Sequence, residues 1–180
     1  MKGLPRGLSA RWGVFAAAVL VVIAVVALFL RVNTTPSVRT GLYLRVPEWM
    51  ASGEPQVGDL VMACPPDGEA VLLALEREYL QPSQTCPAGI VPVLKRVVAV
   101  EGQTVEVRED GLFVDGQRVG DAPPAADSQG RPLVPMYGAW PLDDGALWLG
   151  SEIPNGYDSR YFGPFARDLR EARARLLAAF

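Results

Sequence analysis

The chain has 180 residues and a formal net charge of −3, and no long basic run marks a nucleic-acid-binding surface. It contains no histidine. This absence excludes a Ser-His-Asp triad, a Cys-His pair and every zinc site that uses histidine. Any hydrolytic chemistry must therefore use another base, and lysine or a carboxylate is what remains.

The first predicted element is an apolar helix. Residues 12–30 form a run of 19 residues without a charge, most of them Val, Ala, Leu and Ile. At about 1.5 Å per residue, such a helix nearly spans a hydrocarbon core of about 30 Å. A cleaved secretory signal has an apolar stretch of only about 7–15 residues and a small-residue cleavage site, which is missing just beyond Leu30. The sequence therefore predicts a retained transmembrane anchor.

The charges flanking this helix predict its orientation. Three basic residues precede it and two follow it: Lys2, Arg6 and Arg11, then Arg31 and Arg39. Short segments with excess positive charge stay on the cytoplasmic side of a membrane. Residues 1–11 are therefore expected in the cytoplasm, and residues 31–180 form one exported domain. The expected location is a bacterial inner membrane, with this domain in the periplasm.

The exported part is predicted to be mainly β. Short alternating or β-branched runs bounded by turn residues indicate strands at 41–46, 56–63, 91–100, 104–107, 112–114, 117–119 and 146–150. Two helices are expected, at 70–80 and 165–180, and the Pro- and Ala-rich residues 122–135 predict an irregular excursion. The C-terminal helix has an apolar stripe and an arginine-rich face, so it either docks on the domain or lies on anionic lipid.

Both cysteines, Cys64 and Cys86, lie in the exported part. An oxidising compartment favours a disulfide between them, and two unpaired thiols are the alternative. Two cysteines alone do not complete a tetrahedral shell, so neither a metal site nor a cofactor is expected.

Lys95 lies within the apolar strand predicted at 91–100. Alternation places it on one face with Val93 and Val97, whereas Arg96 points to the other face. One of the two cations must face inward or line a cleft. A desolvated lysine has a lowered pKa and can act as a base, whereas arginine stays charged. Lys95 is therefore the candidate base; a salt-bridged surface lysine is the alternative.

Three sequence segments after the predicted anchor stand out. They are residues 33–43 (Asn-Thr-Thr-Pro-Ser-Val-Arg-Thr-Gly-Leu-Tyr), 94–102 (Leu-Lys-Arg-Val-Val-Ala-Val-Glu-Gly) and 157–164 (Tyr-Asp-Ser-Arg-Tyr-Phe-Gly-Pro). Together they resemble the signal peptidase I superfamily, and within it the conjugative-transfer peptidases of the TraF type, which mature pilin subunits. The resemblance implies a mainly β, signal-peptidase-like β-barrel catalytic domain, with one N-terminal transmembrane helix and a short C-terminal helix.

The resemblance also implies roles for single residues. Ser37 would be the nucleophile, Lys95 the base that takes its proton, and Asp158 an acidic residue that orders the site near the lysine. Arg160, two residues after Asp158, would project to the same side of an extended segment and pair with it. A purely structural ion pair is the alternative for these two.

The oxyanion of such a peptidase needs hydrogen-bond donors. The backbone N–H of Ser37 is one candidate. The resemblance to signal peptidase I implies a side-chain hydroxyl two residues before the nucleophile as the other, which is Thr35 here; Thr34 or a simple turn role for Thr35 stays open. Signal peptidase I also has a serine two residues before the aspartate, where its hydroxyl binds the lysine. This chain has Gly156 there, so what orients Lys95 stays open.

The resemblance thus implies a serine endopeptidase that removes leader segments from membrane-anchored precursors, pilins or secretory proteins, during conjugative transfer. Its partners would be the precursor and the lipid bilayer, and not nucleic acid. A general signal peptidase I is one alternative. A non-catalytic, membrane-tethered β module of a conjugation or secretion assembly is the other. Water or the substrate's own amine could resolve the acyl-enzyme, and the sequence does not decide between them.

Overall fold

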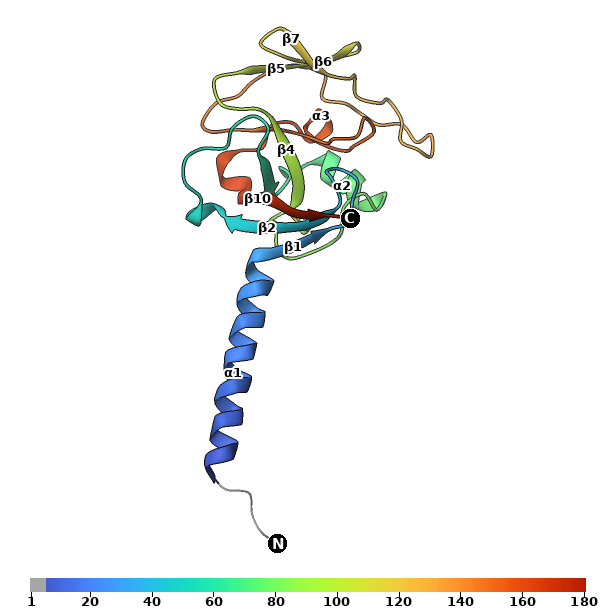
Figure 1. Ribbon diagram of the computed structural model, residues 1–180. Helices are drawn as coiled ribbons and strands as arrows, with labels where there is room; N and C mark the ends of the chain where they lie inside the picture. The colour runs from blue at the N-terminus through green and yellow to red at the C-terminus, as the bar shows by residue number, and fades with distance from the viewer. Residues whose placement is uncertain (1–5) are drawn as a thin grey trace.

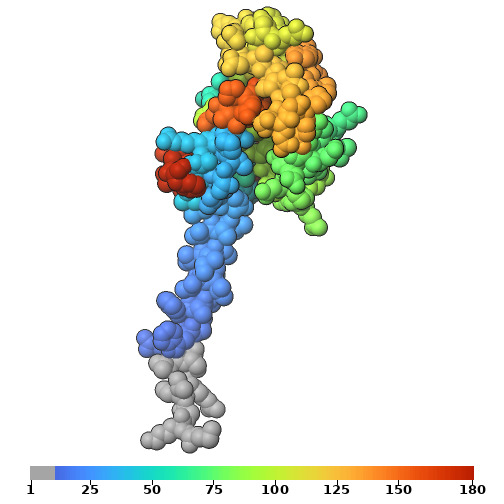
Figure 2. Space-filling view, turned by 90° about the vertical axis from the view of Figure 1, so that its right-hand side faces the viewer, coloured from blue at the N-terminus to red at the C-terminus, as the bar shows by residue number. Residues whose placement is uncertain are grey.

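The computed structural model describes residues 6–180 and has a long helix that leads into a domain made mostly of strands (Figure 1). The helix, α1 (Arg6–Phe29), projects away from the domain as a narrow stem (Figures 1 and 2). Its part from Arg11 to Phe29 has a mean hydropathy of 2.8 and no residue buried by the rest of the chain. A helix of this length and composition can cross a membrane. It fits the predicted membrane-anchored protein.

Six antiparallel strands form the larger sheet, in the order β1-β2-β10-β3-β4-β9. Their bounds are Leu30–Asn33 for β1, Gly41–Pro47 for β2, Arg170–Ala179 for β10, Leu60–Ala63 for β3, Val93–Ala99 for β4 and Trp148–Gly150 for β9. The strands β2, β3, β4 and β9 confirm the sequence predictions, with shifts at their ends. The additional strand β1 continues directly from α1, so the chain enters the sheet where the apolar helix ends.

Four further antiparallel strands form a smaller sheet, in the order β7-β6-β5-β8. Their bounds are Gln117–Gly120 for β7, Gly111–Val114 for β6, Thr104–Arg108 for β5 and Gly138–Pro141 for β8. The turn between β6 and β7 is Asp115-Gly116, with positive φ angles of 50° and 77°. Two-residue hairpin turns of type I′ require positive φ at both positions, and Asp-Gly supplies them. The predicted mainly β fold is confirmed, and β5, β6 and β7 follow one another as an antiparallel meander.

The predicted helix over residues 165–180 is wrong. Residues 170–179 form β10, which pairs with β2 on one side and with β3 on the other. The helical apolar stripe and the many Ala, Arg and Leu residues favour a helix locally. However, β10 satisfies the backbone groups of two strands that would otherwise expose open edges, and this tertiary demand prevails.

The helices of the domain are short. They are α2 (Glu69–Glu76), α3 (Ser159–Phe162) and the single 3-10 turns η1 (Glu48–Met50) and η2 (Arg167–Leu169). The helix predicted at 70–80 is therefore present but ends earlier, and the short helical turns near the C-terminus are α3 and η2.

A disulfide bond joins Cys64, just after β3, to Cys86, in the loop before β4, as predicted. Both cysteines belong to the hydrophobic cluster that also contains Val61, Val97 and Phe165. The bond closes the segment that includes α2. Closing a loop of this length stabilises a fold by about 3 kcal/mol in the chain-entropy model. The disulfide thus ties α2 and its following loop to the sheet that carries Lys95.

Candidate active site

The candidate nucleophile Ser37 lies in a tight loop between β1 and β2. The side-chain amide of Asn33 organises this loop, because its Nδ2 donates to the carbonyl oxygens of Thr35 at 2.9 Å, Val38 at 3.2 Å and Arg39 at 3.3 Å. Val38 is fully buried, and Ser37 beside it is half-buried. The loop is therefore fixed from within, and Asn33 is a residue that the sequence reasoning missed.

Glu152, just after β9, holds the same loop from outside. Its backbone N–H donates to the Ser37 carbonyl oxygen at 2.7 Å. Its carboxylate accepts from the Arg39 backbone N–H at 3.0 Å and from Arg96 Nε, also at 3.0 Å. Because Arg96 lies on β4, Glu152 joins the nucleophile's loop to the strand of the candidate base.

Lys95 faces inward from β4. Burial alternates along this strand, so Val93, Lys95 and Val97 are buried and Arg96 is only half-buried. The side chain of Lys95 lies opposite Val61 of β3 and is 4% exposed. The alternation predicted from the sequence therefore holds, and the cation that turns inward is the one able to lose its proton.

Burial lowers the pKa of Lys95 from 10.5 to about 8. The Asp158 carboxylate opposes this shift, and the Arg160 guanidinium adds to it. An amine with a pKa of about 8 is neutral in about one molecule in ten at pH 7, against about one in 2,500 for an ordinary lysine. Desolvation thus brings Lys95 into the range of a general base.

The hydrogen-bond partner of Lys95 is Ser151. Lys95 Nζ donates to Ser151 Oγ at 2.7 Å. Among residues 6–180, no hydrogen bond joins Lys95 to the Ser37 hydroxyl, although both residues line one cleft. Catalytic hydrogen bonds are often long before substrate binds and tighten in the complex. Ser151 carries no sequence signal for this role, because it lies 56 residues from Lys95 along the chain.

Asp158 and Arg160 form a buried ion pair, as expected, but the expected extended segment is wrong: Asp158 caps the N-terminus of α3 and Arg160 lies in its first turn. Asp158 is 1% exposed and Arg160 is 6% exposed. Arg160 Nε donates to Asp158 Oδ1, and Arg160 Nη2 to Asp158 Oδ2, both at 2.8 Å. Arg160 also donates to the carbonyl oxygens of Pro154 and Gly156. The pair therefore shapes the segment that leads from β9 to α3.

Asp158 reaches the base through the backbone of Ser151. The Ser151 N–H donates to Asp158 Oδ2 at 2.9 Å. In the part of the chain that the structure describes, Lys95 makes no hydrogen bond to Asp158. The carboxylate thus acts on the amine through its charge and through the placement of Ser151.

Thr35, the candidate oxyanion donor, is exposed on the loop two residues before Ser37. Its hydroxyl donates to Asn33 Oδ1 at 2.8 Å. Thr34 is also exposed, and both threonines line the cleft. A threonine hydroxyl has a single proton, so Thr35 can serve an oxyanion only when that proton turns away from Asn33.

The cleft that contains Ser37 and Lys95 has a volume of about 680 Å³. Arg31 and Val32, directly after α1, line it at one side, and Tyr79, Leu133 and Tyr157 line it elsewhere. In Figure 2 it corresponds to the hollow between the blue chain that follows α1 and the green and orange segments. The cleft therefore begins close to the end of the apolar helix.

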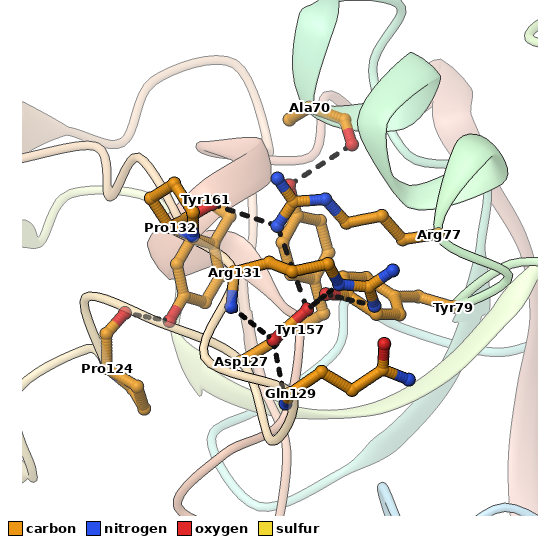
Figure 3. A network of polar contacts seen from close by, with 10 residues as sticks. All are labelled: Ala70, Arg77, Tyr79, Pro124, Asp127, Gln129, Arg131, Pro132, Tyr157 and Tyr161. Carbon is orange, nitrogen blue, oxygen red and sulfur yellow. Dashed lines mark hydrogen bonds and ion pairs between the residues drawn. The ribbon is translucent and has the colours of Figure 1, made fainter.

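A network of polar contacts fixes one wall of this cleft (Figure 3). Asp127 accepts hydrogen bonds from the Tyr79 hydroxyl and, at 2.6 Å, from Arg131 Nε. Arg77 donates to the Pro132 carbonyl oxygen at 2.8 Å. These bonds attach the excursion predicted at residues 122–135 to the segment after α2, so this wall exists before substrate binds.

The described residues hold no group of three Cys, Asp or Glu side chains that could bind a metal ion. The chemical features of the cleft are a half-buried serine, a desolvated lysine with a lowered pKa, and a buried carboxylate–guanidinium pair behind them. A hydroxyl and a neutral amine in one cleft can perform nucleophilic acyl transfer without histidine.

Comparisons with known proteins give an independent assignment. A family model described as signal peptidase, peptidase S26 matches residues 8–178. A probable conjugal transfer protein TraF from Sinorhizobium fredii (strain NBRC 101917 / NGR234) is 44% identical over 135 residues, 74% of this chain and 69% of that protein. A conjugal transfer protein TraF from Agrobacterium fabrum (strain C58 / ATCC 33970) is 41% identical over 139 residues, with 74% and 73% covered.

A plasmid transfer protein TraF from Escherichia coli is 37% identical over 141 residues, 76% of this chain and 75% of that protein. No solved structure shows a significant match to the chain. The family model spans nearly the whole chain, and the relatives share more than a third of their residues with it over most of both lengths. The chain belongs to the signal peptidase family, peptidase S26.

Proposed function

We propose that this chain is a membrane-anchored serine endopeptidase of conjugative transfer, in which Ser37 is the nucleophile and Lys95 the general base. The observation that supports it most is the buried amine of Lys95, whose pKa is lowered to about 8, in the same cleft as Ser37. Membership of a peptidase family and the relatives' names as conjugal or plasmid transfer proteins point the same way.

The reaction follows from the groups in the cleft. Neutral Lys95 takes the proton of the Ser37 hydroxyl as its oxygen attacks the substrate carbonyl. The backbone N–H of Ser37 and the Thr35 hydroxyl stabilise the oxyanion. The Lys95 ammonium then gives its proton to the leaving amine, and an ester on Ser37 remains. Lys95 next activates water, or the substrate's own amine, to resolve that ester and free Ser37.

The proposed topology places the cleft beside the membrane. Residues 1–11 would lie in the cytoplasm, residues 12–30 cross the inner membrane and residues 31–180 form the periplasmic peptidase domain. The cleft begins at Arg31 and Val32, next to the end of α1. A precursor anchored by its own apolar segment presents its cleavage site at that height. This favours membrane-anchored precursors over soluble proteins as substrates. The relatives' names as conjugal transfer proteins fit a substrate of the conjugation machinery, and the resemblance to conjugative-transfer peptidases suggests a pilin precursor.

The test uses the full chain in lipid vesicles together with a membrane-anchored pilin precursor. The Ser37→Ala variant should show no cleavage because the nucleophilic oxygen is gone, whereas Ser52→Ala, in an exposed loop outside the cleft, should cleave like the parent protein. Mass spectrometry of the product separates hydrolysis from cyclisation, which differ by one water. Cleavage by Ser37→Ala would contradict the proposal, and equal cleavage of unrelated secretory precursors would favour a general signal peptidase.

A further inference from the structure

Ser151 occupies a position between the candidate base and the buried ion pair. Its hydroxyl accepts a hydrogen bond from Lys95 Nζ at 2.7 Å, and its backbone N–H donates to Asp158 Oδ2 at 2.9 Å. Asp158 is itself held by two bonds from Arg160. The placement of Ser151 is therefore fixed from behind, and its hydroxyl faces the amine.

Gly156 lies against the same side chain. A Cβ built on Gly156 would be 2.2 Å from both Ser151 Cβ and Ser151 Oγ, far inside van der Waals contact. The φ of Gly156 lies outside the left-handed region, so its backbone conformation does not itself require glycine. The side chain of Ser151 is what excludes a side chain at 156. The two positions compete for one space beside Lys95.

We propose that Ser151 is the positioning residue that aims the Lys95 amine, and that positions 151 and 156 are interchangeable sources of this one hydroxyl. The inference rests on the proposed Ser37–Lys95 reaction. Position 156 is where the resemblance to signal peptidase I calls for the lysine-binding serine. In this chain the hydroxyl reaches the same place from a residue five positions earlier, and Gly156 leaves the room for it.

The physical need for such an acceptor follows from the shape of a neutral amine. A lysine side chain has several rotatable bonds, and its nitrogen has one lone pair, which must point at the Ser37 hydroxyl. The Ser151 hydroxyl accepts one N–H of the amine and so restricts the rotation of the amine about its last side-chain bond. Ser151 does not line the cleft, so its loss should reduce kcat and leave KM nearly unchanged.

Ser151→Ala should lower kcat by about 10²-fold, the cost of a misplaced catalytic group. It should also move the acidic limb of the kcat/KM profile to lower pH. The hydroxyl accepts a bond from the ammonium and stabilises the charged form, so removing it lowers the pKa of Lys95 further. A merely structural role for Ser151 would reduce the amount of folded enzyme without moving this limb.

The decisive experiment exchanges the two residues in the full chain. Ser151→Gly should lose activity like Ser151→Ala. The double variant Ser151→Gly/Gly156→Ser should recover most of the rate and the parental acidic limb, because the serine at 156 now has the free space. Gly156→Ser alone should be destabilised by the clash with Ser151. Parent-like kinetics for Ser151→Ala, or a double variant no better than Ser151→Gly, would overturn the inference.

Failure of this inference is distinguishable from failure of the proposed function. If Ser151→Ala cleaves normally and Ser37→Ala is inactive, only the role of Ser151 is wrong. If the parent protein cleaves no precursor, the proposed function is wrong. Titration of the Lys95 amine by NMR then still decides on the hydrogen bond, because its pKa should fall in Ser151→Ala and return in the exchanged double variant.

Discussion

Replacing Lys95 with methionine should abolish precursor cleavage and at the same time stabilise the folded protein at neutral pH. The loss of a general base costs about 10²–10⁴-fold in rate. The gain in stability has a separate cause. Folding lowers the pKa of Lys95 from 10.5 to about 8, so at pH 7 the fold carries a buried charge that water would hold better. Removing it should add up to about 3 kcal/mol to the free energy of unfolding.

The stability of the parent protein should rise with pH in the alkaline range. Between pH 8 and 10.5 the unfolded chain binds more protons at Lys95 than the folded chain does, so the stability of the parent protein rises with pH across that window. The gain in stability of Lys95→Met over the parent protein should therefore shrink as the pH rises through this window and vanish above pH 10.5. Chemical denaturation of both proteins in the same detergent, at pH 7 and at the alkaline end of the window, measures this.

Lys95→Arg is the matched control. Arginine has similar length but keeps its charge, so this variant should be inactive and less stable than the parent protein. Opposite shifts in stability for methionine and arginine identify the buried charge as the cause. Equal stability of all three proteins would show that Lys95 is solvated and not a desolvated base.

Replacing Asp158 with asparagine should destabilise the protein by about 3–5 kcal/mol, the usual cost of removing one partner from a buried ion pair. Arg160 is 6% exposed and would keep its charge without a carboxylate. The amide also presents N–H donors where Arg160 Nη2 and the Ser151 N–H now donate. Cleavage should fall as well, because Ser151 and then Lys95 lose their placement.

Glu106→Gln provides the comparison for Asp158→Asn. Glu106 and Arg108 are likewise two residues apart and paired, but their side chains are 29% and 45% exposed. Exposed pairs contribute about 0–1 kcal/mol, so this variant should unfold close to the parent midpoint. Thermal unfolding in one detergent compares the two variants. If Asp158→Asn also unfolded close to the parent midpoint, the Asp158–Arg160 ion pair would not stabilise the fold as a buried pair should.

The parts of the site that local sequence predicts are those with a short-range physical cause. The inward direction of Lys95 follows from alternation in an apolar strand. Asp158 and Arg160 do pair, but at the start of α3 and not along the extended segment that was expected. The β6–β7 hairpin follows from one Asp-Gly turn. Each of these needs only a few neighbouring residues.

The parts that the sequence does not predict depend on contacts between distant segments. Strand β10 has the local features of a helix, and only the open edges of β2 and β3 make it a strand. Ser151 has no local feature that connects it to Lys95. The reason for glycine at position 156 becomes evident only from the Ser151 side chain that lies against it. Asn33 is an ordinary loop residue until three carbonyl oxygens converge on its amide.

The pKa of the Lys95 amine tests the central claim most directly. The chain has only two lysines, Lys2 and Lys95, so selective ¹⁵N labelling of lysine gives two side-chain NMR signals, and Lys2 serves as the internal reference. The Lys95 amine should titrate near pH 8. Two amines that both titrate above 10 would contradict a desolvated lysine as the base of this peptidase.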